Sequence, residues 1–87
     1  MQQTDVGTRP RVPRLAIIVP CHNEEPTLPR ALSTLRALLE ALVAERLVAP
    51  DSYVVCVDDG SRDRTWPIVT AEARESPRVR GLKLTRN

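Results

Sequence analysis

Residues 53–65 read YVVCVDDGSRDRT, in which a run of apolar and aromatic residues leads directly into two acids and a glycine. Continuous apolarity, rather than alternation, is typical of a parallel strand that is covered on both faces. The Asp-Gly pair that follows is a strong turn signal. Asp63 can cap a helix, and Pro67 fits the first turn of that helix. The stretch therefore predicts a strand over 53–57, a loop, and a helix over about 64–75.

Similar elements are predicted on both sides of this stretch. Residues 15–19 (LAIIV) predict an earlier strand, which Pro20 stops, and residues 79–85 (VRGLKLT) predict a later one. Between the first two strands, apolar residues recur with the i, i+3, i+4, i+7 spacing of an amphipathic helix over about 27–47. The order β-α-β-α-β predicts an α/β unit with a parallel sheet and right-handed crossovers.

Composition limits the class of protein. A chain of 87 residues is at most one small domain, and 41% hydrophobic with 28% charged residues is typical of a globular one. The net charge is +2 and the aromatic residues are Trp66 and Tyr53, so a base-stacking surface and a nucleic-acid partner are not expected. Residues 1–13 are interpreted as a flexible leader, and residues 14–87 as the domain.

Cysteine usage and hydropathy indicate a cytoplasmic protein. Cys21 and Cys56 have no zinc-site spacing and are expected to fill the core in a reducing compartment. No apolar signal segment begins the chain, and charges interrupt the long apolar-rich helix. A transmembrane helix is therefore not predicted.

Unusual polar residues follow the first two strands, at the edge where parallel sheets bind ligands. The loops read PCHNEE (20–25) and DDGSRD (58–63). Carboxylates there could accept hydrogen bonds from a ribose or a base N–H. The first loop lacks glycine, which disfavours a dinucleotide-binding or P-loop domain. Two alternatives stay open: a metal site, although adjacent acids on an extended chain point opposite ways, and a purely structural turn and cap.

The blocks LAIIVPCHNEE, YVVCVDDGSRDRT and GLKLTRN, in this order, resemble the start of a family 2 glycosyltransferase. The resemblance runs from Leu15 to Asn87. Within the family, it is strongest to the polyprenyl-phosphate sugar transferases, such as bactoprenol glucosyltransferases and dolichol-phosphate mannose synthases. It implies the first half of a GT-A, Rossmann-like nucleotide-sugar-binding domain.

The resemblance also implies a donor-nucleotide site built from both loops. His22 stands where the family more often has tyrosine and could still pack against the base. One acid of the Asp58–Asp59 pair would read the base. Glu24 and Glu25 could alternatively stabilise the dipole of the following helix. The donor-site residues implied in this way are Pro20, His22, Glu24, Val57, Asp58 and Asp59.

The family's metal-binding Asp-x-Asp, which holds Mg²⁺ or Mn²⁺, does not occur in these 87 residues. No catalytic residue and no metal ligand is therefore predicted in the chain, which is expected to be a partial domain without turnover. The parent would transfer sugar from a UDP- or GDP-sugar to a polyprenyl phosphate, at the cytoplasmic face of a membrane. The alternative is a non-enzymatic α/β module of receiver type, although residues 84–86 supply no acid after the third strand.

Overall fold

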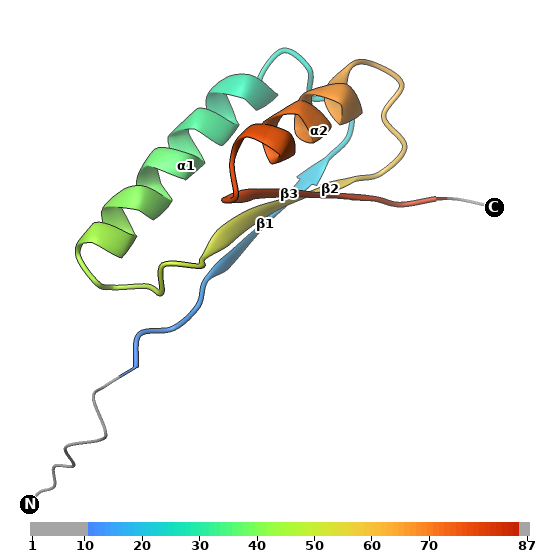
Figure 1. The fold of residues 1–87 in the computed structure, drawn as a ribbon. Coiled ribbons are helices and arrows are strands. Elements are labelled where there is room, and N and C mark those ends of the chain that lie inside the picture. Colours follow the sequence, from blue (N-terminus) through green and yellow to red (C-terminus); the bar gives the residue numbers. More distant parts are fainter. Residues whose placement is uncertain (1–10, 86–87) are drawn as a thin grey trace, which may run out of the picture.

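The computed structural model describes residues 11–85, which form a three-stranded parallel sheet with two helices (Figure 1). The predicted leader, residues 1–13, lies outside the described residues except for 11–13. The strand order is β1-β2-β3, and both strand pairs are parallel. The predicted β-α-β-α-β order is thus confirmed. Its elements are β1 (Ala16–Cys21), α1 (Leu28–Ala44), β2 (Tyr53–Asp58), α2 (Thr65–Glu75) and β3 (Val79–Lys83).

Both helices lie on the same face of the sheet (Figure 1). Val54 and Cys56 of β2 are fully buried beneath them, together with Leu32 of α1. On the opposite face, Ile18 is 59% exposed and Leu82 is 52% exposed. The expectation that the strands are covered on both faces is therefore wrong for the described residues. Two right-handed crossovers that advance in one direction place their helices on one side, so this stretch of chain covers one face.

The strand boundaries differ from the predicted ones at their carboxyl ends. Pro20 does not stop β1: it pairs with Val57, and the strand continues to Cys21. Proline is tolerated because β1 has a neighbour on one side only within the described sheet, so no ladder donor is lost. β2 likewise continues to Asp58, whereas β3 ends at Lys83, two residues before the predicted end.

Helix α1 ends at Ala44, three residues before the predicted end, because the backbone turns there. Arg46 has φ 61°, in the left-handed region, and its N–H donates to the carbonyl of Val43 at 2.9 Å. The N–H of Leu47 donates to the carbonyl of Leu42, also at 2.9 Å. This pair of bonds is the Schellman motif, which closes the last turn of a helix.

Arg46→Gly is expected to stabilise the fold by about 0.5–1 kcal/mol. The left-handed conformation costs a residue with a Cβ roughly 1–2 kcal/mol, and the entropy that glycine loses on folding offsets about half of that gain. Urea unfolding should show the higher midpoint. Glu45→Gly is the matched control, because φ is −87° there and glycine relieves no strain. A midpoint for Arg46→Gly at or below that of the unaltered chain would contradict the prediction.

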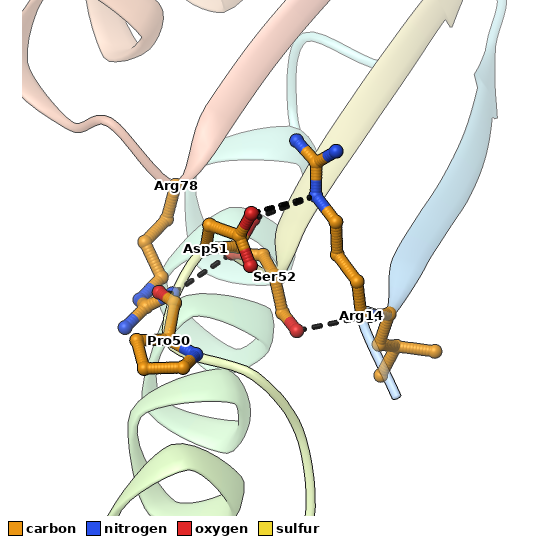
Figure 2. A network of polar contacts seen from close by, with 6 residues as sticks. Arg14, Pro50, Asp51, Ser52 and Arg78 are labelled. Carbon is orange, nitrogen blue, oxygen red and sulfur yellow. Dashed lines mark hydrogen bonds and ion pairs between the residues drawn. The ribbon is translucent and has the colours of Figure 1, made fainter. Parts of the chain in front are cut away.

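Arg78 connects the amino ends of β2 and β3 through hydrogen bonds (Figure 2). Its side chain is 14% exposed, and Nη1 donates to the carbonyls of Pro50 at 2.7 Å and Ser52 at 2.8 Å. Its Nε donates to Glu40 at 2.8 Å. The hydroxyl of Ser52 accepts the N–H of Leu15 at 2.9 Å, which brings the start of β1 into the same network. Arg78 therefore fixes the chain that enters β2.

Helix α2 approaches β3 closely at Gly81. A Cβ placed on this residue would lie 2.6 Å from Cγ1 of Val69 and 3.1 and 3.2 Å from two ring atoms of Trp66. Val69 is fully buried. The absence of a side chain at Gly81 therefore sets how closely the helix packs on the strand.

Candidate functional site

The two polar loops meet at the carboxyl edge of the sheet, as the sequence predicts. Cys21 and Asp58, the last residues of β1 and β2, are paired in register. Just beyond them, the N–H of Asp59 donates to the carbonyl of Cys21 at 2.9 Å. The residues that follow each strand therefore start their loops side by side.

Hydrogen bonds join the two loops along their length. The backbone N–H groups of residues 23–25 in the first loop all donate to side-chain oxygens of the second loop and of the helix start after it. Ser61, Asp63 and Thr65, spaced two residues apart, each supply one of these acceptors. We call the whole set the loop ladder: His22 Nδ1 to the Asp59 carbonyl (2.8 Å), Asn23 N–H to Ser61 Oγ (2.9 Å), Arg62 N–H to Asn23 Oδ1 (2.8 Å), Glu24 N–H to Thr65 Oγ1 (2.7 Å), Glu25 N–H to Asp63 Oδ2 (3.1 Å), and Arg64 N–H to Glu25 Oε1 (3.2 Å).

Asp63 serves both the ladder and the start of α2. Its Oδ1 accepts the backbone N–H of Thr65 at 2.9 Å and the hydroxyl of the same residue at 2.5 Å. The predicted N-cap position is wrong by one residue, because α2 begins at Thr65 and its N-cap is Arg64, without a side-chain cap; Asp63 nevertheless accepts the N–H of the first helical residue. Its Oδ2 accepts the N–H of Glu25, which the sequence did not predict. The hydrogen bond from the Thr65 hydroxyl lowers the pKa of the Asp63 carboxyl below its ordinary value of 3.8.

This lowered pKa predicts a stability loss in acid. A carboxylate whose pKa is lower in the folded state than in the unfolded state stabilises the fold at pH values above its unfolded-state pKa. This contribution disappears as the pH falls through the folded-state pKa. Unfolding free energies of the chain and of Asp63→Asn should therefore differ most above about pH 4 and converge below it. The Arg78 hydrogen bond also lowers the pKa of Glu40, but both proteins share that effect. A difference that stays constant down to about pH 2.5 would contradict the prediction.

A cavity of about 460 Å³ opens at the ladder. It is lined by His22, Asn23, Asp59, Gly60 and Arg62, so both loops contribute. Its volume lies within the roughly 300–1,000 Å³ of small-molecule sites. Two of these residues have positive φ, 54° at Asn23 and 74° at Gly60, which asparagine and glycine adopt most readily. The loop backbone is thus shaped around the cavity.

Of the residues implied as a donor site, His22 and Asp59 line this cavity, and Pro20, Glu24, Val57 and Asp58 do not. The carbonyl of Glu24 accepts the N–H groups of Thr27 and Leu28 at the start of α1. Contact of all six residues with a ligand stays a prediction. The other three lining residues, Asn23, Gly60 and Arg62, lie inside the two predicted loops but were not among the predicted site residues.

The adjacent acids have different environments, as expected for neighbours on an extended chain. Asp58 is fully buried, and its Oδ1 accepts a hydrogen bond from the Ser61 hydroxyl. Its Oδ2 is also buried and has no hydrogen-bond partner among the described residues. Asp59 is half-buried and lines the cavity. Of the two acids, Asp59 therefore lines the cavity and Asp58 does not.

Among the residues that the structure describes, no set of metal ligands is present. Within residues 11–85, no three His, Cys, Asp or Glu side chains gather where they could hold an ion.

Both thiols are buried core residues, and burial raises the pKa of Cys56 to about 12 and also raises that of Cys21. Across the same described range, neither helix has the length and apolarity to cross a membrane.

Known proteins that resemble the chain are sugar transferases. It is 43% identical over 75 residues to an uncharacterised glycosyltransferase of Bacillus subtilis, covering 86% of this chain and 22% of that protein. It is 34% identical over 74 residues to a prophage bactoprenol glucosyl transferase homologue of Escherichia coli, covering 85% and 22%. With an undecaprenyl-phosphate 4-deoxy-4-formamido-L-arabinose transferase of Shewanella sediminis, identity is 36% over 74 residues, covering 84% and 20%.

The chain thus spans about a fifth of the length of the curated relatives it matches. No solved structure matches it. The model of one protein family covers residues 16–87, from the first strand through both polar loops to the last residue. The chain therefore belongs to glycosyl transferase family 2.

Proposed function

We propose that the chain is the donor-nucleotide half of a glycosyltransferase that moves a sugar from a UDP- or GDP-sugar to a polyprenyl phosphate. The observation that carries the proposal is the cavity at the carboxyl edge, where Asp59 and His22 lie together. This is the edge at which parallel α/β sheets bind nucleotides. The acceptor class rests on relatives that are named for bactoprenol and undecaprenyl phosphate.

Different residues of the cavity bind different parts of the donor. The carboxylate of Asp59 accepts the imide N–H of uracil or the N–H groups of guanine. The His22 ring packs against the base. Arg62 brings a positive charge to the same cavity, where it favours the diphosphate. Pro20, Glu24 and Val57 would complete the pocket around the nucleoside, and Asp58 would support the loop from below.

The divalent metal belongs to another part of the proposed enzyme. In the family, Mg²⁺ or Mn²⁺ is held by an Asp-x-Asp motif, which these 87 residues do not contain. The described residues 11–85 offer no alternative group of ligands, so they do not fit the ion. We therefore expect the chain to bind a nucleotide without transferring sugar.

Asp59→Ala tests the proposal, with an expected tenfold to hundredfold loss of affinity for UDP or GDP. A hydrogen bond to a charged group is worth roughly 1.5–3 kcal/mol, which corresponds to this range. Titration calorimetry measures it. Asp51→Ala removes the same charge at the opposite edge of the sheet, where the Asp51 side chain is 66% exposed, and should bind normally.

A second control separates binding from stability. Asp63→Ala should lower the free energy of unfolding by about 1 kcal/mol, as expected when a capping residue is lost. If Asp59→Ala binds both nucleotides as tightly as the unaltered chain, the proposed reading of the base by Asp59 is wrong.

A further inference from the structure

The hydrogen bonds around His22 determine which ring nitrogen carries the proton. Nδ1 lies 2.8 Å from the carbonyl oxygen of Asp59, and a carbonyl oxygen can only accept, so Nδ1 donates. Nε2 lies 3.3 Å from Nδ2 of Asn23. An amide nitrogen donates, so Nε2 accepts and carries no proton. In the neutral ring, these two contacts together fit the Nδ1–H tautomer.

The orientation of the Asn23 amide is fixed in turn by the second loop. Its Oδ1 lies 2.8 Å from the backbone nitrogen of Arg62, and a backbone N–H can only donate. The amide oxygen must therefore face Arg62, which leaves the NH₂ group facing His22. The result is a continuous chain of donors and acceptors from Arg62 through Asn23 and His22 to Asp59. These four residues all line the cavity.

Asparagine is well suited to this position. Its φ of 54° is left-handed, which asparagine adopts more readily than most residues. Its side chain also offers one acceptor and two donors, so a single residue can accept a hydrogen bond from Arg62 and donate one to His22. Aspartate has the acceptor but not the donors, and glycine has the backbone conformation but neither.

We infer that Asn23 is a positioning residue that holds the His22 ring in one tautomer and orientation for the nucleobase; this inference rests on the proposed function. Because both ring nitrogens are satisfied within the chain, His22 offers a ligand the face of its ring rather than a hydrogen bond. A ring fixed before binding loses less entropy when a base packs against it. The loop ladder thus prepares the binding surface as well as joining the loops.

The tautomer can be read directly, because His22 is the single histidine of the chain. Nitrogen-15 NMR of the imidazole should show the Nδ1–H tautomer in the unaltered chain. Asn23→Gly keeps the left-handed backbone and removes the donor to Nε2, so only the Asp59 carbonyl still favours Nδ1–H and the Nε2–H tautomer should become partly populated. Asn23→Asp keeps the acceptor for Arg62 but places a carboxylate beside Nε2, so both ring nitrogens should carry protons.

Glu25→Ala is the matched control. Glu25 also accepts a backbone N–H of the second loop, that of Arg64 at 3.2 Å, but it does not contact the ring. This variant should lose a similar loop contact and keep the Nδ1–H tautomer. In calorimetry with UDP and GDP, Asn23→Gly should bind about two- to tenfold more weakly than Glu25→Ala, as expected for one neutral hydrogen bond.

The possible outcomes separate the inference from the proposed function. An Nε2–H tautomer in the unaltered chain, or an unchanged tautomer in both Asn23 variants, would overturn the inference. A changed tautomer with the nucleotide affinity of Glu25→Ala would overturn the role in binding. If the unaltered chain binds neither UDP nor GDP, the proposed donor site and that role both fail, while the spectra still decide whether Asn23 fixes the ring.

Discussion

Arg78→Met is expected to lower the free energy of unfolding by about 3 kcal/mol. Methionine keeps an aliphatic stem but leaves the carbonyls of Pro50 and Ser52 without the charged donor they now share. Hydrogen bonds to charged groups contribute about 1.5–3 kcal/mol each, and groups left without a partner add a desolvation cost. Glu40 contributes little, because its side chain is 65% exposed. Urea unfolding of both chains measures the loss.

The control for this prediction is substitution of Arg14, which Figure 2 also shows. Arg14 also forms an ion pair, with Asp51 at 3.2 Å, but the two side chains are 50% and 66% exposed. Arg14→Met should therefore cost less than about 1 kcal/mol. Arg78→Lys should fall between the two, since an ammonium keeps the charge but not the planar fork of donors. Equal losses for Arg14→Met and Arg78→Met would show that burial of Arg78 does not matter.

Gly81→Ala is expected to destabilise the fold by about 2–3 kcal/mol, at the upper end of the cost of overpacking. The new methyl would lie 2.6 Å from Cγ1 of Val69, which belongs to a stiff, β-branched and fully buried side chain. It would also press on the Trp66 ring, so helix α2 would have to move away from β3. Thermal or urea unfolding shows the effect.

Val69→Ala makes room for this methyl and so tests whether the clash with Val69 causes the loss of stability. Each single substitution should destabilise, Gly81→Ala by crowding and Val69→Ala by leaving a cavity. The double variant should be clearly more stable than the sum of the two losses predicts, because the added methyl occupies part of the space left by the two deleted methyls. Additive losses would mean that the clash with Val69 is not the cause.

The sequence predicts the order of elements because each has its own local signal. The apolar runs at 15–19 and 53–57 and the helical spacing between them do not depend on distant contacts. It does not predict that Pro20 lies inside β1, because the side on which a strand has its neighbour is a property of the sheet. The end of α1 was missed for a related reason, since Arg46 takes the left-handed position that glycine usually marks.

The site shows the same division between local and distant information. Sequence reasoning places both loops at one edge, because all carboxyl ends of a parallel sheet meet there. It leaves open which acid of the 58–59 pair is accessible, and the structure answers with Asp59 at the cavity and Asp58 buried. The contacts of Asn23 with Arg62 and of Asp63 with Glu25 could not be predicted, because each joins residues that are far apart in the chain.

That separation has a consequence for the order of events in folding. The bonds of the loop ladder join residues 37 to 41 positions apart, so each closes a loop of chain that contains both α1 and β2. Contacts of long sequence separation require the chain entropy to be lost before they form. We therefore expect the cavity to form together with the pairing of β1 and β2, because that pairing joins residues that are equally far apart in the chain, such as Cys21 and Asp58.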